Sequence, residues 1–409
     1  MRVLEIIGSV DPRHGGPVEG VIRQAVARRQ FGLETSIVTL DPPNEPWLRD
    51  IPVPIVALGR SGGAGSSRLP WRRYGLGSTM VPWLRQNLCE HDVAVVNGLW
   101  NYAVCAARRT LIDSGVPYVV FAHGMLDPWL LHRHPVKHAA KRLSFALIEK
   151  PLLDRARAVL FATEDERNRA RAGDWRFAAP DRIVGYGTAE PDGDPAAQVE
   201  AFGRLIPALR ERRFLLFLGR LHPIKGCDLL VEAFARVAAQ RRDVDLVIAG
   251  PDPVGWRTEL QRRAAALGLA ERIHWLGMLT GDAKLGALRS CDAMVLPSHS
   301  ESFGMVVAEA LAAAAPVLIT DKVPLWRDVA ADGAGLADSD DVDGVHRVLE
   351  AFLSAPPERI GRMRGAARAC FLRRYEISIA TRRYTDALRD AARGTAETGR
   401  PAPVMAMKC

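Results

Sequence analysis

Two short apolar runs in this chain each end in glycine and lead, through a turn, into a segment with helical periodicity. The first run is Val-Leu-Glu-Ile-Ile-Gly at residues 3–8, and the second is Phe-Leu-Leu-Phe-Leu-Gly at residues 214–219. Apolar residues between positions 18 and 26 then recur at the i, i+3, i+4 and i+7 spacing of one helix face. A further strand at residues 35–40 completes a βαβ unit, so the pattern predicts a parallel sheet.

The same alternation of strands and helices continues through both halves of the chain. Further strands are expected near residues 53–58, 93–97, 117–122, 158–162, 245–249, 272–276, 293–296 and 316–319. This predicts an α/β fold with two Rossmann-like domains. A polar, turn-rich stretch indicates a linker at residues 191–212, which places the first domain at residues 1–190. Residues 393–409 are small, polar and aperiodic, and are expected to form a flexible tail.

Composition narrows the class of protein. No apolar run approaches the roughly 20 residues that a membrane span needs, and the N-terminus begins a strand-like segment rather than a leader, so we expect a cytoplasmic protein. The six cysteines are scattered without CxxC spacing and imply no metal site. The formal net charge of +8 favours anionic partners. Because no nucleic-acid-binding motif is present, nucleotide phosphates and an acidic membrane surface are favoured over nucleic acid.

Two basic residues follow the first strand of the second half, where parallel strands present their ligand-binding loops. Arg220 and Lys225 lie in the sequence Gly-Arg-Leu-His-Pro-Ile-Lys-Gly, directly before a helix. Cations at a helix N-terminus are unfavourable unless an anion is also present. A planar guanidinium and an ammonium group together suit a diphosphate. The alternative is a pair of solvated surface charges.

Residues 296–311 place two carboxylates in an otherwise apolar setting. After a strand, a turn carries Glu301 and a helix begins near Gly304. Every residue from 305 to 315 except Glu309 is apolar, so this helix is expected to be buried nearly all round. A carboxylate in such a helix needs partners, and the hydroxyls of a ligand would serve.

Two helix starts are expected to offer backbone N–H groups to a ligand. One includes Phe303, Gly304 and Met305, whose N–H groups can hold hydroxyls or phosphate oxygens. The other follows Gly-Gly-Pro at residues 15–17, where glycine permits close approach and proline suits the first helical turn. Taken alone, a Gly-Gly-Pro turn is a weak signal, because it is often only a turn.

Five motifs occur in one order along the chain. They are a glycine loop at residues 15–17, a histidine loop at 122–125, G-R-x4-K-G at 219–226, glycine-ended strands at 246–250 and 273–277, and the E-x7-E pair of Glu301 and Glu309. Together they resemble glycosyltransferase family 4, whose members are retaining nucleotide-sugar enzymes, over about residues 1–390. The segments at residues 97–101 and 123–129 are also similar to those of bacterial surface-polysaccharide members.

The resemblance implies the GT-B fold, in which two Rossmann-like domains have parallel sheets that face each other across a cleft. The second, nucleotide-sugar-binding domain would span residues 213–372. A C-terminal helix at residues 373–392 would cross back and pack on the first, acceptor-side domain. The expected asparagine-glycine after the last strand of the first half is replaced at residues 183–188 by Ile-Val-Gly-Tyr-Gly-Thr.

The resemblance also implies a donor site with named roles. Glu301 would contact the donor sugar near its anomeric carbon, and Glu309 would hold the ribose hydroxyls. Arg220 and Lys225 would neutralise the diphosphate as it leaves. The other donor contacts would come from Gly15, Gly16, Gly277, Met278, Leu279, Phe303, Gly304, Met305 and Val306.

His123 completes the expected catalytic set with Glu301, Arg220 and Lys225. Directly after a strand of the first half, it would donate to a sugar hydroxyl or phosphate oxygen, and a purely structural histidine is the alternative. Asp127 is a weaker candidate for contact with the acceptor, together with Trp129.

The implied mechanism needs no nucleophilic carboxylate, no metal and no cofactor. The leaving phosphate itself would help to deprotonate the acceptor on the same face of the sugar, and side-chain cations would replace Mg²⁺. The sequence Asp-Val-Asp at residues 243–245 spells a DxD motif. It precedes a strand, however, and so is expected at the end of the sheet opposite the ligand.

A basic segment suggests an anionic membrane surface as a further partner. Residues 132–142 concentrate lysine, arginine and histidine, and anionic headgroups attract such clusters at about 1 kcal/mol per basic residue. Trp129 and the two leucines that follow it could insert shallowly. The alternative is a solvated helix face.

Three functions are compatible with these features. The favoured one is a retaining, metal-independent hexosyltransferase that moves a sugar from a nucleoside diphosphate sugar to a glycan or polyprenyl-linked acceptor in exopolysaccharide, capsule or lipopolysaccharide assembly, peripheral to the inner face of the plasma membrane. A catalytically silent nucleotide-sugar-binding subunit would be expected to lose Glu301, Arg220 or Lys225, and all three are present. A related epimerase or phosphorylase is disfavoured by the E-x7-E spacing.

Overall fold

The computed structural model describes residues 1–59, 79–128, 135–210 and 212–394 of the 409-residue chain, and the side chains of residues 135–139 are not described. The chain divides into two units. Unit 1 comprises Met1–Tyr186 and the chain from Ile377 on, and unit 2 comprises Gly187–Glu376. Trp129 and most of the expected tail lie outside the described residues.

Unit 1 contains a parallel seven-stranded sheet with strands in the order β3-β2-β1-β4-β5-β6-β7. The strands are β1 (Arg2–Ile7), β2 (Glu34–Thr39), β3 (Ile55–Ala57), β4 (Val93–Asn97), β5 (Tyr118–Phe121), β6 (Ala158–Phe161) and β7 (Asp181–Ile183). The helices are α1 (Gly16–Ala27), α3 (Met80–Asn87), α4 (Tyr102–Ser114), α5 (Pro135–Ser144), α6 (Lys150–Arg155), α7 (Glu164–Ala172) and α16 (Ile377–Arg393), with a π-helical turn at Phe145–Glu149.

Strand alternation assigns the helices of unit 1 to two faces of the sheet. Leu4 and Ile6 of β1 pack in one core with residues of α3, α4 and α6. Ile7 packs on the other face with residues of α1. Successive side chains of a strand point to opposite faces, so each face of this sheet is covered by its own helical layer.

Unit 2 contains a parallel six-stranded sheet with strands in the order β10-β9-β8-β11-β12-β13. The strands are β8 (Arg213–Leu218), β9 (Val244–Ala249), β10 (Ile273–Leu276), β11 (Ala293–Leu296), β12 (Val317–Thr320) and β13 (Gly335–Asp338). The helices are α8 (Pro195–Leu205), α9 (Cys227–Ala238), α10 (Arg257–Ala266), α11 (Gly281–Ser290), α12 (Met305–Ala312), α13 (Trp326–Ala331), α14 (Val342–Leu353) and α15 (Pro357–Cys370), followed by a π-helical turn at Phe371–Tyr375. Residues 195–205, within the segment expected as a linker, form α8, which packs on α11.

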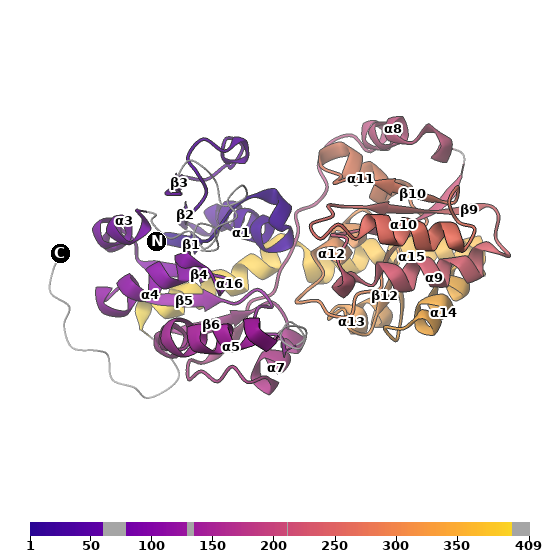
Figure 1. Cartoon of the computed structure of the whole chain (residues 1–409). Coiled ribbons are helices and arrows are strands. Elements are labelled where there is room, and N and C mark those ends of the chain that lie inside the picture. The colour runs from indigo at the N-terminus through magenta and orange to yellow at the C-terminus, as the bar shows by residue number, and fades with distance from the viewer. Residues whose placement is uncertain (60–78, 129–134, 211, 395–409) are drawn as a thin grey trace. The chain divides into compact units, whose positions relative to one another are not determined.

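The last helix, α16, belongs to unit 1 although it follows all of unit 2 in the chain. It contacts α1, β4 and β5, and Figure 1 shows it in yellow beside these elements. Thr381 donates to Gln24 Oε1 at 3.0 Å, and Arg389 donates to the carbonyl of Phe31 at 2.9 Å. The expectation of two parallel sheets, with a C-terminal helix that packs on the first, is therefore confirmed.

Strand order positions the candidate site. In unit 2 the order reverses between β8 and β11, which are neighbours although their numbers are not consecutive. The loops that leave these two strands therefore begin side by side at the carboxyl edge of the sheet, where ligands bind in folds of this type.

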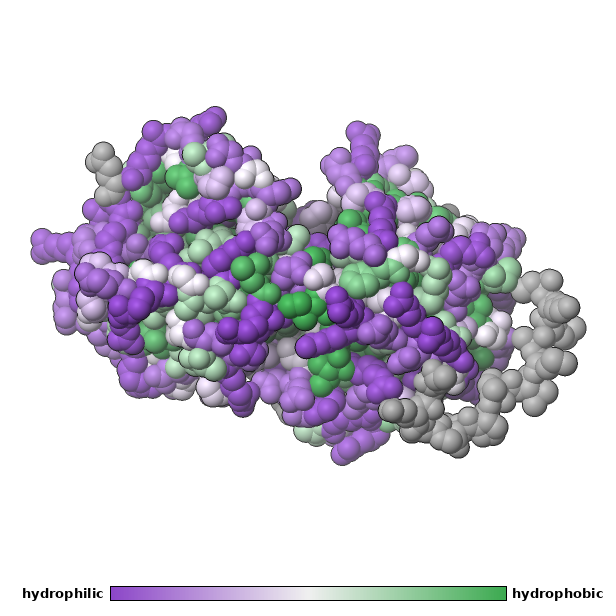
Figure 2. All heavy atoms as spheres, turned by 180° about the vertical axis from the view of Figure 1, so that it is seen from behind, coloured by the Kyte–Doolittle hydropathy of each residue, from purple (hydrophilic) through white to green (hydrophobic). Residues whose placement is uncertain are grey.

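The surface drawn in Figure 2 is mostly polar. Figure 2 shows hydrophilic residues over most of the rear face, with hydrophobic residues in separate patches.

Candidate active site

The loops after β8 and β11 are locked together by their backbones. His299 N–H donates to the carbonyl of Ile224 at 2.8 Å. Gly226 has a φ of +64°, and a Cβ at this position would overlap the carbonyl oxygen of Pro297. Glycine is therefore required at position 226 both by its conformation and by this close approach.

This packing brings Lys225 to Glu301, two of the residues that the sequence singled out. Their side chains form an ion pair and are only 15% and 10% exposed. Ser298 is buried and donates its hydroxyl to Glu301 Oε1 at 2.9 Å, while the hydroxyl of Thr320 donates to the carbonyl of Ser298 at 2.6 Å. Glu301 is therefore held by Lys225 from the loop after β8 and by Ser298 from its own loop, and Ser298 is in turn tied to the end of β12.

Arg220 lies in the same loop as Lys225, and its side chain is exposed. It follows Gly219, whose N–H donates to the carbonyl of Ala249 at 3.0 Å at the end of the adjacent strand. The loop thus exposes Arg220 to solvent and holds Lys225 against the carboxylate of Glu301. The sequence did not single out Ser298, three residues before Glu301, or Thr320, whose contact with Ser298 depends on the pairing of β11 and β12.

The helix that follows Glu301 begins as expected. Gly304 has a φ of +94° at the N-cap of α12, and in the described structure no side chain caps this end. Phe303 is buried and packs edge-on against Tyr375, with ring centroids 5.9 Å apart. An uncapped N-terminus directs backbone N–H groups and the positive end of the helix dipole outward, which suits an anion.

Glu309 lies on α12 among fully buried apolar residues, as predicted. The structure supplies the partner that its burial demands. Lys284 Nζ lies 2.8 Å from each carboxylate oxygen, and the side chains of Lys284 and Glu309 are 20% and 8% exposed. Sequence analysis missed Lys284, because the packing of α11 on α12 is not visible in periodicity.

The turn after β10 is tied to the ends of β8 and β9. The carbonyl of Gly277 accepts from Gly250 N–H at 3.0 Å. Gly250 has a φ of +148°, and a Cβ there would overlap the carbonyl oxygen of Gly219. In the turn itself, Met278 is exposed and Leu279 is buried. Gly250 thus lets the ends of β8 and β9 approach closely at the edge that carries the candidate site.

Unit 1 has an uncapped helix of its own at the predicted glycine loop. Gly15 is the N-cap of α1 with a φ of +76°, and Gly16 is the first helical residue. In the described structure no side chain caps this helix. Both units therefore begin a helix from a glycine with positive φ, directly after a loop at the carboxyl edge of their sheets.

His123 is buried, and both of its ring nitrogens are engaged. Nε2 lies 2.9 Å from Asn97 Oδ1, and Nδ1 contacts the Tyr186 hydroxyl. Because the amide nitrogen of Asn97 donates to Glu5 Oε2 at 2.6 Å, its oxygen must accept, so the proton of His123 is on Nε2 and Nδ1 accepts from Tyr186. Burial lowers the pKa of His123 to about 3, which keeps the ring neutral.

The chain of polar contacts from His123 continues into the core of unit 1. Glu5, in the central strand β1, pairs with Arg28 at 2.6 Å, and both side chains are fully buried. The guanidinium of Arg28 lies 4.3 Å from the ring centre of Tyr384 on α16. Sequence analysis missed this network because its members come from strands and helices far apart in the chain.

The backbone around His123 is held from a second side by α7. His123 and Gly124 have φ values of +50° and +76°. Glu166 accepts from the N–H groups of Gly124 at 2.5 Å and Ala162 at 2.6 Å, and burial raises the pKa of this carboxyl to about 7. The start of α7 had a sequence signal, since Thr163-x-x-Glu166 has the spelling of a helix capping box, but the contact with Gly124 had none.

Asp127, a candidate for acceptor contact, is already engaged. Its carboxylate accepts from Arg169 of α7 at 2.9 Å. The other candidate for acceptor contact, Trp129, lies outside the described residues.

The Asp-Val-Asp spelling at residues 243–245 spans the start of β9, and Asp245 is bound there by Arg212, Arg272 and His274.

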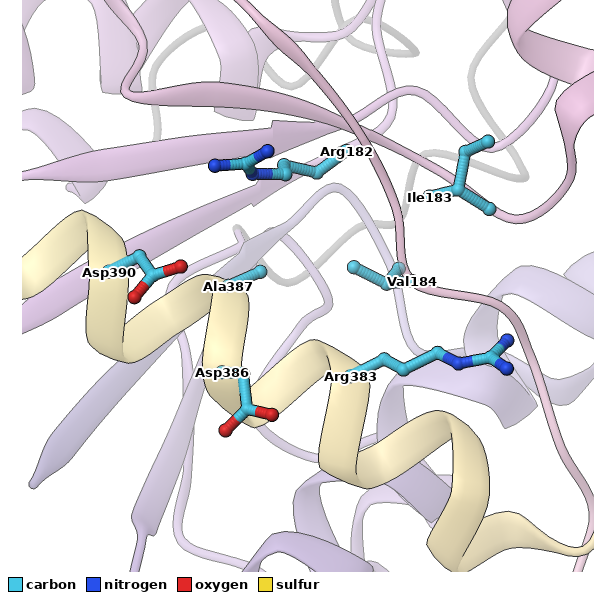
Figure 3. A pocket seen from close by; sticks show the side chains of 7 residues that line it. All are labelled: Arg182, Ile183, Val184, Arg383, Asp386, Ala387 and Asp390. Carbon is cyan, nitrogen blue, oxygen red and sulfur yellow. The ribbon is translucent and has the colours of Figure 1, made fainter. Parts of the chain in front are cut away.

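A separate surface cavity of about 560 Å³ lies in unit 1 between β7 and α16. Figure 3 shows Arg182 on the β7 side, with Arg383, Asp386 and Asp390 projecting from α16. Two arginines and two aspartates give this cavity no net formal charge, so it lacks the positive charge that a diphosphate requires.

Comparison with known proteins agrees with this geometry. The family model for "Glycosyl transferase 4-like domain" matches residues 15–187, and that for "Glycosyl transferases group 1" matches residues 206–369. The two matches therefore cover the two units in turn. In the described part of the chain, no helix is both long and apolar enough to cross a bilayer.

Curated relatives match parts of the chain. A D-inositol 3-phosphate glycosyltransferase of Mycolicibacterium gilvum is 33% identical over 61% of this chain and 58% of its own length. A phosphatidyl-myo-inositol mannosyltransferase of Mycolicibacterium smegmatis is 36% identical over 42% of this chain and 43% of its own. The alignments thus span less than two thirds of these relatives.

Solved structures match nearly the whole chain in fold. A sucrose-phosphate synthase of Thermosynechococcus elongatus superposes with a TM-score of 0.78 at 18% identity, covering 96% of this chain and all of that one. HepE of Anabaena, in complex with UDP and glucose, gives 0.76 at 17% identity, covering 95% of this chain and all of that one. The chain therefore belongs to the GT4-like, group 1 glycosyltransferases and has their GT-B fold.

Proposed function

We propose that this protein is a retaining glycosyltransferase that moves a sugar from a nucleoside diphosphate sugar to a glycan or lipid-linked acceptor in the assembly of exopolysaccharide, capsule or lipopolysaccharide. The observation that carries the proposal is the pairing of Lys225 with Glu301 beside the uncapped start of α12. A cation, a carboxylate and outward backbone N–H groups together suit a sugar attached to a diphosphate. The UDP and glucose in the HepE complex agree with a donor of this class.

In the proposed reaction the bond between the anomeric carbon and the diphosphate oxygen breaks, and the new glycosidic bond forms on the same face. The acceptor proton passes to the leaving diphosphate. Lys225 and Arg220 stabilise the charge that develops on that group, and the N–H groups of residues 303–306 bind its oxygens. Glu301 holds the sugar hydroxyls near the anomeric carbon, and Glu309 holds those of the ribose.

His123 contributes to this reaction from unit 1 under the same proposal. Its single ring N–H is used by Asn97 in this structure. Direct donation to the sugar or phosphate therefore requires that this hydrogen bond be exchanged for one to the ligand.

The function is tested by thermal unfolding of the purified protein with UDP, GDP and ADP in parallel. A ligand at about 100 times its Kd stabilises the folded protein by roughly 2.7 kcal/mol, so one nucleotide is expected to raise Tm while the others do not. Sugar derivatives of that nucleotide are then assayed for release of the free diphosphate. No shift with any nucleotide at millimolar concentration would contradict a donor site, and binding without transfer to any acceptor offered would favour a silent subunit.

We further propose that unit 1 binds anionic membrane surfaces. Leu143 and Leu147 stand one helical turn apart at the junction of α5 and the π-helical turn, and they are 63% and 59% exposed. Arg142 beside them is also exposed. Exposed leucines next to basic residues suit the boundary between headgroups and acyl chains.

Binding to vesicles tests this surface. Wild-type protein is expected to sediment with vesicles that contain phosphatidylglycerol, and the double variant Leu143→Glu, Leu147→Glu should bind at least about tenfold more weakly, because the added carboxylates oppose both insertion and charge attraction. Leu205→Glu is the matched control, since Leu205 is 52% exposed on α8 of unit 2. Equal sedimentation of all three proteins would exclude this membrane surface.

A further inference from the structure

Lys284 is not among the donor-binding residues proposed so far, yet it forms an ion pair with both carboxylate oxygens of one of those residues, Glu309. Its ammonium nitrogen lies 2.8 Å from both carboxylate oxygens of Glu309. The two residues come from successive helices, α11 and α12. We propose that Lys284 is a positioning residue that holds the Glu309 carboxylate in the orientation that selects ribose over deoxyribose, an inference that rests on the proposed nucleotide-sugar site.

The location of Lys284 argues against an incidental surface charge. It is the fourth residue of α11, in the first turn of that helix. A cation at this end is opposed by the helix dipole. Its side chain is also only 20% exposed, so the long aliphatic stem has lost much of the freedom that a solvated lysine keeps. Both costs are offset only if the ammonium group has a fixed anionic partner, and Glu309 is that partner.

The backbone that carries Lys284 is itself fixed. Two residues further along α11, a Cβ on Gly286 would overlap the carbonyl oxygen of Gln198 in α8. Arg289, on the next turn, donates to the side-chain oxygen of Gln198 at 2.7 Å. Because α8 and α11 are packed at backbone distance, Lys284 projects from a rigid base. Rigid support of this kind is what holds a binding group in one geometry.

Glu309 in turn needs support from outside its own helix. The residues on either side of it in α12, Ala308 and Ala310, are fully buried, and the side chain of Glu309 is 8% exposed. The methyl side chains of these two alanines cannot form hydrogen bonds and so cannot fix the rotation of the Glu309 carboxylate. With one lone pair on each oxygen directed at Lys284, the remaining lone pairs have a defined direction. Two adjacent hydroxyls, as on C2 and C3 of ribose, can donate to both oxygens at once.

This geometry explains how a missing hydroxyl would be detected. A ligand that lacks the 2′-hydroxyl loses one hydrogen bond to a nearly buried carboxylate. Sites built to bind a hydroxyl discriminate strongly against analogues without it for this reason. Without Lys284 the carboxylate can turn toward whichever donor remains, so the penalty for the missing hydroxyl should shrink.

Calorimetric titration with nucleotides tests the proposal without any acceptor. Kd is measured for the nucleoside diphosphate that stabilises the wild-type protein and for its 2′-deoxy counterpart. We expect wild type to favour the ribonucleotide by about 20-fold or more. Lys284→Met should reduce that preference to about threefold or less, and Lys284→Arg, which keeps the charge, should retain an intermediate preference. Glu309→Gln should lose the preference, and adding Lys284→Met to it should cause no further loss.

Controls separate this proposal from the function on which it rests. Lys322→Met removes a lysine of the same unit that is 45% exposed and paired with Asp321, and it should leave the ratio unchanged. If Lys284→Met fails to fold, the comparison is made with Lys284→Gln and Lys284→Arg. A wild-type preference that survives in the folded Lys284 variants would overturn the positioning role while leaving the donor site intact. Absence of nucleotide binding by wild type would overturn the proposed function and this inference together.

Discussion

Replacing Lys225 with alanine is expected to lower kcat/KM for sugar transfer by about 10²- to 10³-fold, the usual cost of removing one group that stabilises charge in a transition state. Lys225 forms an ion pair with Glu301, in the turn that leads to the uncapped start of α12. In the proposed reaction, departure of the diphosphate would place negative charge beside Lys225, and little solvent reorganisation would be needed because the ammonium group is already in place. The loss should therefore fall mainly on kcat.

The comparison is made by initial rates with the donor identified from the thermal shifts. Lys150→Ala is the matched control, because Lys150 makes an ion pair with Asp154 in unit 1. This substitution removes the same charge from the protein as Lys225→Ala does. Lys225→Arg should recover part of the activity. If Lys225→Ala stays within about threefold of wild type, the assignment of the diphosphate site to this loop is wrong.

Replacing Glu5 with alanine is expected to destabilise unit 1 by about 3–5 kcal/mol, the range found when one partner of a buried ion pair is removed. Glu5 lies opposite Ile37 and Val95 in the middle of the sheet, where it accepts from Arg28 and from Asn97. Alanine leaves the guanidinium of Arg28 buried without its counter-ion. It also frees the amide group that sets the tautomer of His123.

Hydrogen exchange followed by mass spectrometry reports on unit 1 separately from unit 2, which urea unfolding of the whole chain does not. Peptides from β1 and β4 should exchange at least about 100-fold faster in Glu5→Ala, since each 1.4 kcal/mol corresponds to a tenfold change. Glu19→Ala removes the partly exposed i,i+4 partner of Arg23 and should cost only about 0.3–0.5 kcal/mol. Similar exchange in both variants would show that the buried pair does not stabilise the sheet.

The fold could be read from the sequence because its signals are local. Apolar runs of four to six residues alternate with helical periodicity in both halves, and parallel strands connected by helices permit few topologies. The burial of α12 was predicted by the same reasoning, since only Glu309 interrupts its apolar sequence. The prediction that α16 packs on unit 1 depended on the family resemblance, because the sequence of this helix does not indicate which of the two sheets it covers.

The candidate site could be predicted only in part. Strand ends identified Lys225 and Glu301, because the loops that leave adjacent strands begin at the same edge of a sheet. The groups that hold the candidate residues in place were missed, and each comes from a different element: Ser298, in the loop after β11, contacts Glu301; Lys284, in α11, contacts Glu309; and Asn97, in β4, contacts His123. Such contacts depend on which helix packs on which and at what rotation. That information lies in side-chain packing between segments distant in sequence.

The return of α16 to unit 1 sets an order of events during protein synthesis. Unit 2 is continuous in the chain from Gly187 to Glu376, so its sheet can form as soon as it leaves the ribosome. Unit 1 is complete only after α16 has been synthesised. At about 5–20 residues per second, this occurs roughly 10–40 s after the synthesis of Tyr186. Until then the apolar face that receives Tyr384 and Leu388 is open to solvent. The sheet of unit 1 is thus expected to gain its full stability only after the whole of unit 2 has been synthesised.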